Sequence, residues 1–477
     1  MRILMASPEC APFAETGGLG HMVSGLAKAL ANRHHDVRLF LPLYGFIHPQ
    51  NDWFCHRDIS VYMGQKIEKC QVYEVVQNGI TFYFIDAPNY FKDAAIYVDG
   101  TYNGERFAFF CRAVLDSCST LQWAPEVIHC HDWATGLIPV YCNTLRSCHP
   151  ISAAATVFTI HNLQYQGIFS PSILSFAGIP FSEFHSTSLE ALGQVNFLKG
   201  ALYHSTKITT VSPRYAQEIQ TTEFGCGLDP VLRFKAGDLI GILNGIDTDV
   251  WNPETDPLIP SHFTSNNLGP KEECKKSIRD QFHLPHTQAP LLGVVSRICW
   301  QKGLDVFANV LPYLLNNTQL QVVILGTGDM NLENQFRSLE QPFSNQVRMI
   351  TQYDSGLAHR LQAGCDLFIL PSRYEPCGLA QLYAMRYGTL PIVRATGGLA
   401  DTVQSLNESD ETGYGFVFSD LHNDAIYNTV HWAYRIYTEK PHLFQKMQKT
   451  AMEADFSWAH SSTQYESVYQ WAFNQRG

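Results

Sequence analysis

The sequence is short of positive charge, of paired cysteines and of long apolar runs. Its 477 residues include 33 Lys and Arg against 44 Asp and Glu, which gives a formal net charge of −11. Because nucleic-acid binding depends on clustered cations, this balance argues against a nucleic-acid partner. No stretch approaches the roughly 20 apolar residues of a membrane-spanning helix. The 13 cysteines include no Cys-x-x-Cys spacing, so neither a zinc ribbon nor a thioredoxin-type site is indicated.

The composition that remains is that of a globular protein. Hydrophobic residues make up 45% of the chain and charged residues 16%, and the length exceeds one ordinary core, so we expect two domains. The N-terminal run "MRILMASPECAPF" is too short, and too interrupted by prolines, for a secretory signal. With its cysteines read as free thiols in a reducing compartment, the sequence predicts a soluble cytoplasmic protein without a membrane partner.

Short apolar runs alternate with helical patterns through most of the chain. In the first half the runs are "RILMAS", "DVRLFL", "EVIHC", "ATVFTI", "KITTVS" and "GDLIGIL", and in the second "PLLGVVS", "LQVVILG", "VRMITQ", "DLFILPS" and "LPIVRA". Continuous rather than alternating runs indicate strands buried on both faces, hence parallel strands covered by helices. The predicted fold class is therefore α/β, with a doubly wound parallel sheet in each half.

Two stretches interrupt this rhythm. Asn78-Gly79 separates two strand-like runs in "QVYEVVQNGITFYFID", a strong hairpin signal, and we expect antiparallel strands at an edge of the first sheet. The segment from Trp251 to Pro290 is rich in Pro, Asn and Ser and is the expected linker. We accordingly expect a first domain over residues 1–250 and a second over 251–456.

The tetrad Thr-Gly-Gly-Leu occurs twice, at residues 16–19 and 396–399. Each copy follows an expected strand, at the edge where open parallel sheets bind ligands, and precedes an expected helix. Glycines there let backbone N–H groups approach an anion. A single Gly-Gly is equally well explained as a tight turn, but two copies in equivalent sheets favour a pair of ligand-binding loops facing each other across a cleft. The first copy opens a helix whose apolar stripe is Leu19, Met22, Val23, Leu26 and Leu30.

Arg297 and Lys302 lie on the loop that follows the run "LLGVVS". Arg offers a planar fork to phosphate oxygens, and Lys offers a compact charge. In a chain with few cations, two of them after one buried strand indicate an anion site. A surface ion pair is the alternative.

Six longer stretches carry a more specific signal: "IHCHDWATGL", "FTIHNLQYQGIF", "ILNGIDTDVWNPETD", "VVSRICWQKGLD", "LPSRYEPCGLAQLYAMRYGTLPIVRATGGLADTV" and "DFSWAHSSTQYESVY". In their order and spacing, from residue 3 to about 470, the chain resembles the bacterial glycogen synthase and plant starch synthase family. The resemblance implies the GT-B arrangement, two Rossmann-like domains facing a central cleft, with a C-terminal helix (457–477) returning to the first domain. It implies transfer of glucose, with retention, from ADP-glucose to the non-reducing end of an α-1,4-glucan such as glycogen, without a cofactor.

The resemblance also assigns roles to single residues. Arg297 and Lys302 would meet the donor diphosphate, where negative charge develops as the nucleotide leaves. Glu375, in "EPCGL", would contact the donor glucose, and His161 would lie at the reaction centre. The other expected substrate contacts are Glu15, Gly17, Gly18, Asp132, Asn162, Asn244, Tyr353 (on the nucleobase), Gly378, Leu379, Thr396 and Gly397.

The residues around Glu375 bear on the mechanism. Eight positions after it stands Tyr383 rather than a second carboxylate. Double displacement of the glycosidase type needs two carboxyl groups about 5 Å apart, so we favour a front-side displacement in which the leaving phosphate helps to deprotonate the acceptor hydroxyl. His129 and His131 share a strand face and could form part of a metal site. No third ligand has supporting spacing, so we predict no metal.

The first glycine loop departs from the family pattern. The family has Lys before the Thr and Asp two positions after the Leu, whereas this chain has Glu15 and His21. We expect Glu15 to pair with a cation, such as a protonated His21, or to turn away from the phosphates. Two alternatives stay open at this point: a UDP-sugar donor, and a catalytically impaired glucan-binding homologue. We favour an active ADP-glucose enzyme because the assigned catalytic positions are all retained.

Overall fold

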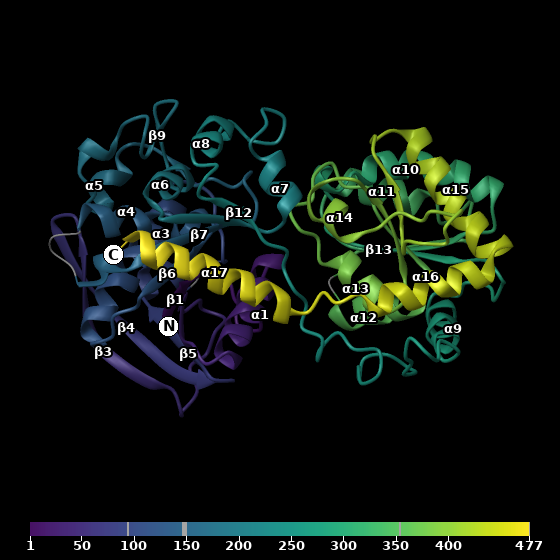
Figure 1. The fold of residues 1–477 in the computed structure, drawn as a ribbon, viewed down its shortest axis with the longest axis horizontal. Helices are drawn as coiled ribbons and strands as arrows, with labels where there is room; N and C mark the ends of the chain where they lie inside the picture. The colour runs from purple at the N-terminus through teal and green to yellow at the C-terminus, as the bar shows by residue number, and fades with distance from the viewer. Residues whose placement is uncertain (93–94, 146–149, 353, 477) are drawn as a thin grey trace. The chain divides into compact units, whose positions relative to one another are not determined.

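The computed structural model describes residues 1–92, 95–145, 150–352 and 354–476. The chain divides into two compact units, Met1–Gly245 with Trp458–Gly477 and Ile246–Ser457 (Figure 1). Each unit has its own sheet and its own covering helices, and each is described by itself.

The first unit is built on a nine-stranded sheet in the order β12-β11-β7-β6-β1-β2-β5-β4-β3. Neighbours from β12 to β5 are parallel, and β4 and β3 are added antiparallel. The strands are β1 (Arg2–Ala6), β2 (Asp36–Pro42), β3 (Phe54–Met63), β4 (Lys66–Gln77), β5 (Ile80–Asp86), β6 (Val127–His131), β7 (Ala155–Ile160), β11 (Lys207–Thr210) and β12 (Leu239–Gly241). Counted along the chain, β5-β2-β1-β6-β7-β11 is the 3-2-1-4-5-6 order of a Rossmann sheet.

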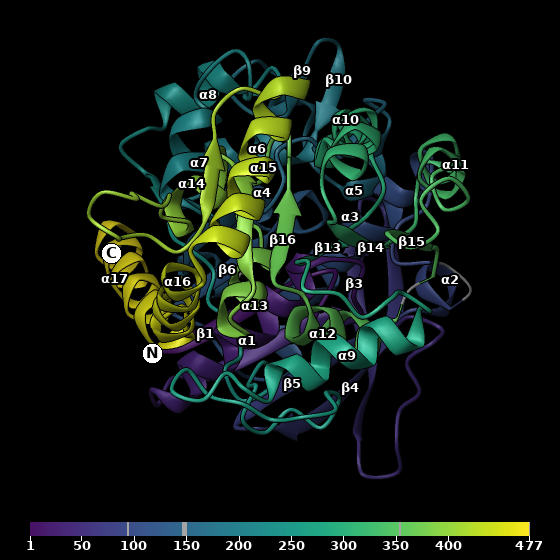
Figure 2. The same cartoon turned by 90° about the vertical axis from the view of Figure 1, so that its right-hand side faces the viewer.

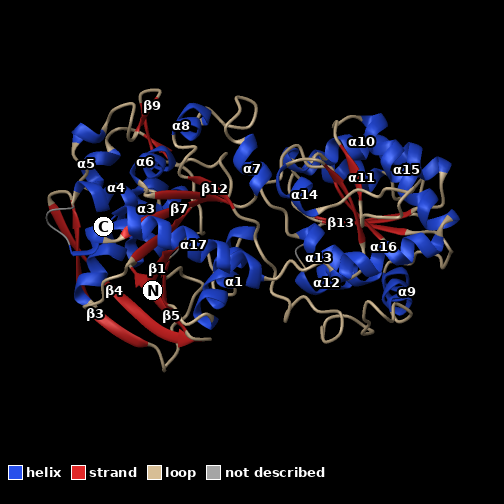
Figure 3. Cartoon of the chain, viewed as in Figure 1, coloured by secondary structure: helices blue, strands red, loops and turns tan. Residues whose placement is uncertain are grey.

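The predicted hairpin is confirmed as the β4–β5 pair at the edge of this sheet (Figure 3). Asn78 and Gly79, which connect the two strands, have φ of +51° and +76°. Positive φ at both central residues is the requirement of the two-residue turn that matches strand twist.

Helices cover both faces of the first sheet (Figure 3). The five residues of the predicted stripe are all buried in α1. The helices are α1 (Gly18–Asn32), α2 (Pro88–Phe91), α3 (Thr101–Thr120), α4 (Leu137–Thr144), α5 (Ile173–Ala177), α6 (Phe197–His204), α7 (Pro213–Glu218) and α8 (Asp229–Phe234), with short 3-10 turns η1 (Trp133–Thr135), η2 (Pro150–Ala153) and η3 (Phe181–Glu183). A small antiparallel sheet of β8 (Ile168–Phe169), β10 (Gln194–Asn196) and β9 (Glu190–Ala191) was not anticipated, because its strands are only two or three residues long.

The last helix, α17 (Trp458–Arg476), packs on the first unit against α1, β6 and β7 (Figure 1). Its Tyr465 and Tyr469 are fully buried. Its Glu466 forms ion pairs with Arg33 at 2.5 Å and His35 at 2.7 Å. The hydrogen bond from Arg33 lowers the pKa of Glu466 to about 2. The first unit is therefore completed by a segment that follows the whole second unit in the sequence.

The second unit has a six-stranded sheet, parallel throughout, in the order β15-β14-β13-β16-β17-β18. This is again the 3-2-1-4-5-6 order. The strands are β13 (Leu291–Val295), β14 (Gln321–Leu325), β15 (Val347–Ile350), β16 (Leu367–Leu370), β17 (Leu390–Arg394) and β18 (Phe416–Phe418). The helices are α9 (Lys271–Gln281), α10 (Leu304–Asn317), α11 (Met330–Ser338), α12 (Ser355–Gly364), α13 (Ala380–Arg386), α14 (Gly397–Thr402), α15 (Asn423–Glu439) and α16 (Pro441–Glu453), and η4 (Trp300–Lys302) is a 3-10 turn.

Continuous apolar runs bury both faces of the second sheet. Leu292 and Val322 pack in one core together with α10 and α15, whereas their neighbours Leu291 and Val323 pack in another with α9 and α12. Figure 2 shows these two helical layers with the sheet between them. Every run expected to be a strand forms one, so the predicted α/β class with two parallel sheets is confirmed. No helix in the described part of the chain is both long and apolar enough to span a bilayer.

Candidate active site

Each sheet reverses its strand order once, between β1 and β6 in the first unit and between β13 and β16 in the second. Open α/β sheets bind ligands outside the carboxyl ends of the strands at such a point. Several of the expected site residues follow these four strands: the first glycine loop after β1, Asp132 after β6, Arg297 and Lys302 after β13, and Glu375 after β16. His161 follows β7, and the second glycine loop follows β17. The topology therefore places each group at the binding edge of its own unit.

In the second unit Lys302 and Glu375 form an ion pair, with Nζ donating to Oε2 at 2.6 Å. The Ser372 hydroxyl donates to the same oxygen at 2.9 Å. Glu375 is 6% exposed, and the Lys302 side chain is 17% exposed. Both of these donors therefore reach the same oxygen of the Glu375 carboxylate, Oε2.

A fork between Arg373 and Asp305 holds the two loops of this pair together. Arg373 donates to both Asp305 oxygens, at 2.6 and 2.7 Å, and to the carbonyl oxygen of Trp300 at 2.6 Å. The hydrogen bond from Arg373 lowers the pKa of Asp305. Bidentate pairs of this kind fix geometry as well as adding energy. Neither Arg373 nor Asp305 was predicted as a site residue from the sequence, although each lies inside one of the stretches that resemble the family.

Arg297 is joined to the same site through Gln301. Its Nη2 donates to Gln301 Oε1 at 3.2 Å, and Gln301 Nε2 donates to the Tyr374 carbonyl oxygen at 3.4 Å. The Arg297 side chain is exposed. The structure therefore brings Arg297 onto the same edge as Lys302 and Glu375, with its guanidinium open to solvent.

The second glycine loop, residues 396–399, is buried and packs against the loop of Glu375. The Gly398 N–H donates to the Glu375 carbonyl oxygen at 3.0 Å. A Cβ on Gly397, whose φ is +44°, would lie 1.9 Å from that oxygen. Glycine is required here because the two backbones touch. Gly378 also has a positive φ, +72°.

In the first unit Asp132 and His161 meet at the ends of β6 and β7. Asp132 Oδ1 accepts the His161 backbone N–H at 2.7 Å, and Asp132 has φ of +57°. Burial raises the pKa of Asp132 to about 8, in spite of the backbone N–H bonds that it accepts from His161 and Asn162. Burial lowers the pKa of His161 to about 3. His161 is consequently uncharged at neutral pH, and Asp132 keeps its proton to a higher pH than a free carboxyl group does.

Behind them lie two sets of buried hydrogen bonds, one made by His131 and one by His129. His161 Nε2 lies 3.1 Å from His131 Nδ1. His129 contacts the Tyr469 hydroxyl at 2.9 Å through Nδ1 and Thr159 Oγ1 at 2.6 Å through Nε2. Burial lowers the pKa of His129 to about 3. The His129–His131 pattern thus serves internal hydrogen bonding, and the described residues contain no group of three or more His, Cys, Asp or Glu side chains that could hold a metal ion.

The first glycine loop is exposed from Glu15 to Gly18. His21 Nε2 lies 3.3 Å from Glu15 Oε2, and the two side chains are 45% and 35% exposed. The expected contact between Glu15 and His21 is confirmed. Gly17 precedes the first turn of α1, and its φ of −176° is open to any residue.

Glu9, which the sequence analysis did not single out, anchors this loop. Its carboxylate is 3% exposed and accepts the Thr16 N–H at 2.6 Å, the Thr16 hydroxyl at 2.9 Å and the Tyr97 hydroxyl at 2.7 Å. Burial, and then the charge of Glu9, raise the pKa of Tyr97 well above its usual value, so the hydroxyl stays a donor. The position of Glu9 shortly before the Thr-Gly-Gly-Leu tetrad is the sequence feature that could have identified it.

The remaining expected residues are less closely tied to these clusters. Asn244 is 6% exposed, and no described residue bonds to its buried Oδ1. Asn162 Oδ1 accepts the Gln164 N–H at 3.1 Å. Leu379 precedes α13. Tyr353 lies outside the described residues.

Two Rossmann-ordered units, each with polar or charged side chains at its switch point, can each bind a ligand there. The family models and a solved structure similar to the chain identify the class as the GT-B glycosyltransferases. Residues 2–234 match the family described as starch synthase catalytic domain. Residues 275–446 match the family described as glycosyl transferases group 1.

Full-length relatives identify the family. The chain is 42% identical over 476 residues to a glycogen synthase of Koribacter versatilis, covering 98% of both. It is 41% identical over 475 residues to one of Anoxybacillus flavithermus, covering 98% of this chain and 97% of the relative. The catalytic domain of Starch Synthase IV from Arabidopsis thaliana, solved with ADP and acarbose, is 34% identical with a TM-score of 0.92 and 99% of each chain covered. The chain belongs to the glycogen synthase and starch synthase family of glycosyltransferases.

Proposed function

We propose that this member of the glycogen synthase family transfers glucose, with retention, from ADP-glucose to the non-reducing end of an α-1,4-glucan. The observation that carries the proposal is the Lys302–Glu375 pair at 2.6 Å on the binding edge of the second sheet. It sets a cation beside a carboxylate, as a site for a sugar attached to a diphosphate requires. The names of the bacterial relatives and the ADP and acarbose bound to the Arabidopsis enzyme support the choice of donor and acceptor.

Lys302 and Arg297 are proposed to hold the diphosphate. As the bond to glucose breaks, negative charge grows on the distal phosphate, and fixed cations stabilise that charge most when they need not move. The Arg373–Asp305 fork, which fixes the Lys302 loop, would supply this rigidity. Backbone N–H groups of Gly378 and Leu379 are proposed as further donors to the phosphates.

Glu375 and His161 are proposed to orient the transferring glucose. Glu375 would accept a sugar hydroxyl at the carboxylate oxygen that Lys302 does not occupy. His161, which is uncharged at neutral pH, and Asp132, whose pKa burial raises, suit a sugar, which is neutral and has many hydroxyl groups. Asn162 and Asn244 are proposed to add hydrogen bonds to the donor or acceptor sugars.

A front-side displacement is proposed for the chemical step. Tyr383, at the position where a second carboxylate could stand, stacks on Trp251 with ring centroids 3.7 Å apart. Without a nucleophile there, the leaving phosphate oxygen would take the proton of the acceptor hydroxyl while that hydroxyl attacks on the same face. The new bond then keeps the α configuration.

The remaining residues of the site are proposals of the same kind. Gly17, Gly18, Thr396 and Gly397 would shape two loops beside the substrate, Tyr353 would contact the nucleobase, and Glu15 would lie close to the phosphates. We also propose that the protein works in the cytoplasm, as a bacterial-type glycogen synthase.

The test is a transfer assay with purified protein, glycogen and labelled ADP-glucose or UDP-glucose, followed by analysis of the new linkage. We expect transfer from ADP-glucose and an α-1,4 bond, and activity that EDTA leaves intact. Preferential use of UDP-glucose would show that UDP-glucose, and not ADP-glucose, is the donor. A β linkage would refute retention. No transfer from either donor would favour the impaired glucan-binding homologue. Loss of activity with EDTA, restored by a metal ion, would show that the reaction needs a metal.

A further inference from the structure

A cavity of about 440 Å³ lies in the second unit between α9, α15 and α16. Asp366, which directly precedes β16, and Gln288, just before β13, form part of its wall. Both residues stand at the amino ends of their strands. Lys302 and Glu375 follow the carboxyl ends of the same two strands, so the cavity lies at the opposite edge of the sheet from the candidate active site.

Asp366 presents an unused acceptor to this cavity. Its side chain is 6% exposed. The Leu291 N–H at 2.7 Å and the Lys275 ammonium at 2.8 Å both bind Oδ2. Among the described residues nothing donates to Oδ1. Asp366 lines the cavity, so a hydroxyl bound there could donate to this free oxygen.

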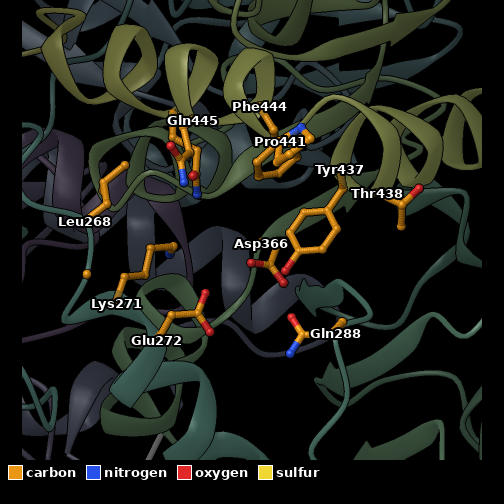
Figure 4. A pocket seen from close by; sticks show the side chains of 12 residues that line it. Leu268, Lys271, Glu272, Gln288, Asp366, Tyr437, Thr438, Pro441, Phe444 and Gln445 are labelled. Atoms are coloured by element: carbon orange, nitrogen blue, oxygen red, sulfur yellow. The ribbon is translucent and has the colours of Figure 1, made fainter.

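The rim adds polar side chains that are also available. Glu272, Gln288 and Gln445 are exposed, and within the described chain none of their side-chain atoms makes a hydrogen bond or ion pair. Figure 4 shows Glu272 and Gln288 on one side of the space and Gln445 with Phe444 on the other. Carboxylates accept hydrogen bonds, and amides both accept and donate.

The two lysines near the cavity are already satisfied. Lys271 Nζ donates to the carbonyl oxygens of Ala363 and Tyr387 and to the Thr389 hydroxyl, at 2.8 to 2.9 Å. An ammonium has three donors, so all of them are used. Lys275 is paired with Asp366 and donates to the Tyr437 hydroxyl. With two carboxylates in its lining, and with both lysines engaged by acceptors of the protein, the cavity is poorly suited to phosphates or nucleotides.

We propose that this cavity is an accessory carbohydrate site that binds a neutral sugar, a maltose-sized unit of an α-glucan. Its volume falls within the range of about 300–1,000 Å³ typical of small-molecule sites, which is far more than an ion needs. Sugar hydroxyls would donate to Asp366 and Glu272 and bond to the glutamine amides. The apolar face of the ring would lie on Tyr437 and Pro441, which also line the cavity. The lining by itself points to a neutral ligand with several hydroxyl groups, and the choice of an α-glucan rests on the function proposed for the other edge.

Maltotriose binding to the full-length protein, measured by titration calorimetry, tests the proposal. The variants are Glu272→Ala with Gln445→Ala, and separately Gln445→Trp, which fills the cavity from its exposed rim. The matched control is Glu273→Ala, an exposed carboxylate on the same helical turn outside the lining. We expect wild type and control to show a class of site that the lining variants lose, or that weakens by about tenfold, the usual loss when hydrogen bonds to charged groups are removed.

Identical maltotriose binding in all four proteins would overturn the proposal. Binding of inorganic phosphate that depends on the same lining residues would overturn the assignment to a neutral sugar. Glucose transfer, measured with a short soluble acceptor, should be equal in all four proteins. A protein that transfers no glucose but binds maltotriose through this lining would refute the proposed function and leave this inference standing.

Discussion

The two Thr-Gly-Gly-Leu loops have the same four residues and opposite surroundings. Thr16, Gly17 and Gly18 are exposed, and a Cβ on Gly17 would meet no described atom within 4 Å. Residues 396–399 are buried, and a Cβ on Gly397 would lie 1.9 Å from the Glu375 carbonyl oxygen. In the second loop glycine is required by the protein's own packing. In the first it leaves open space, which a ligand can enter.

The charges around the two loops differ in the same way. The second loop packs beside a partly buried ion pair between Lys302 and Glu375, whereas the first carries the solvent-exposed Glu15–His21 contact. Exposed pairs are weak because water screens them. A repeated tetrad therefore marks equivalent positions in two sheets, and the surrounding contacts decide what each copy does.

The largest effect on kcat is expected from the cations of the second unit. Lys302→Ala, and separately Arg297→Ala, should lower kcat by about 10²–10³, since one lost electrostatic donor commonly costs about 2.7–4 kcal/mol. Steady-state kinetics with ADP-glucose, beside a glucan-binding assay, would separate turnover from binding. Lys276→Ala, an exposed lysine of α9, is the control. Normal turnover in both variants would remove them from the site.

Alanine at the two equivalent glycines tests the packing difference directly. Gly397→Ala should lower the free energy of unfolding by about 1–3 kcal/mol, the usual cost of overpacking, with added strain from its positive φ. Gly17→Ala should change it by less than about 0.5 kcal/mol, as exposed substitutions usually do. Urea denaturation of both variants measures the contrast. Equal destabilisation would show that the two loops do not differ in how tightly their glycines are packed.

The buried histidines of the first unit should make it sensitive to acid. Below about pH 6.5 the unfolded chain protonates at histidine, whereas the folded unit keeps His129 neutral down to about pH 3. The contribution of His129 to the free energy of unfolding is therefore complete above about pH 6.5. It decreases as pH falls, by about 1.4 kcal/mol per pH unit. His129→Gln should reduce the slope of unfolding free energy between pH 4 and 6 by about that amount. His48→Gln, at an exposed histidine, is the control.

Asp132 changes the free energy of unfolding with pH in the opposite direction. The pH slope of His129→Gln must therefore be compared with the slope of the wild-type protein and not with zero. Its pKa of about 8 in the folded protein means that the fold keeps a proton which the unfolded chain releases above about pH 3.9. Stability from Asp132 thus falls as pH rises from about 4 to about 8. An unchanged acid slope in His129→Gln would show that His129 is not neutral in the fold.

The smallest effect is expected at Glu15. Two unit charges about 5 Å apart interact by roughly 3 kcal/mol at an effective dielectric near 20, and exposure reduces this. Glu15→Lys should therefore raise kcat/KM for ADP-glucose by about threefold to tenfold at neutral pH, and His21→Asp alone should lower it. A decrease in Glu15→Lys would mean that the carboxylate has a positive role in the reaction.

The strands could be predicted because burial on both faces leaves a continuous apolar run, as in β6 and β7, where every residue is buried. Of the strands that escaped prediction, β18 is too short to leave any pattern. β3 is longer, but most of it is exposed or half-buried, so it has no continuous apolar run. Their existence depends on neighbouring strands rather than on their own sequence.

The candidate site, too, could be predicted only in part from the sequence. Arg297, Lys302 and Glu375 could be proposed from strand ends and motifs, but their contacts could not. Lys302 and Glu375 are 73 positions apart, and His129 and Tyr469 are 340 apart. Such contacts depend on how the sheet is wound. The Arg373–Asp305 fork was missed because its residue types are ordinary on any surface, and only geometry shows that they support the pair.

Helix α17 determines when the fold of the first unit can be completed during translation. Domains commonly fold from the N-terminus as the chain leaves the ribosome. The first unit, however, obtains the Tyr469 partner of His129 and the Glu466 partner of Arg33 from a segment synthesised after all of Ile246–Ser457. The unit that begins synthesis is therefore the last to be completed, and until then the face of β6 and β7 that α17 covers remains open to the chaperones of the cell.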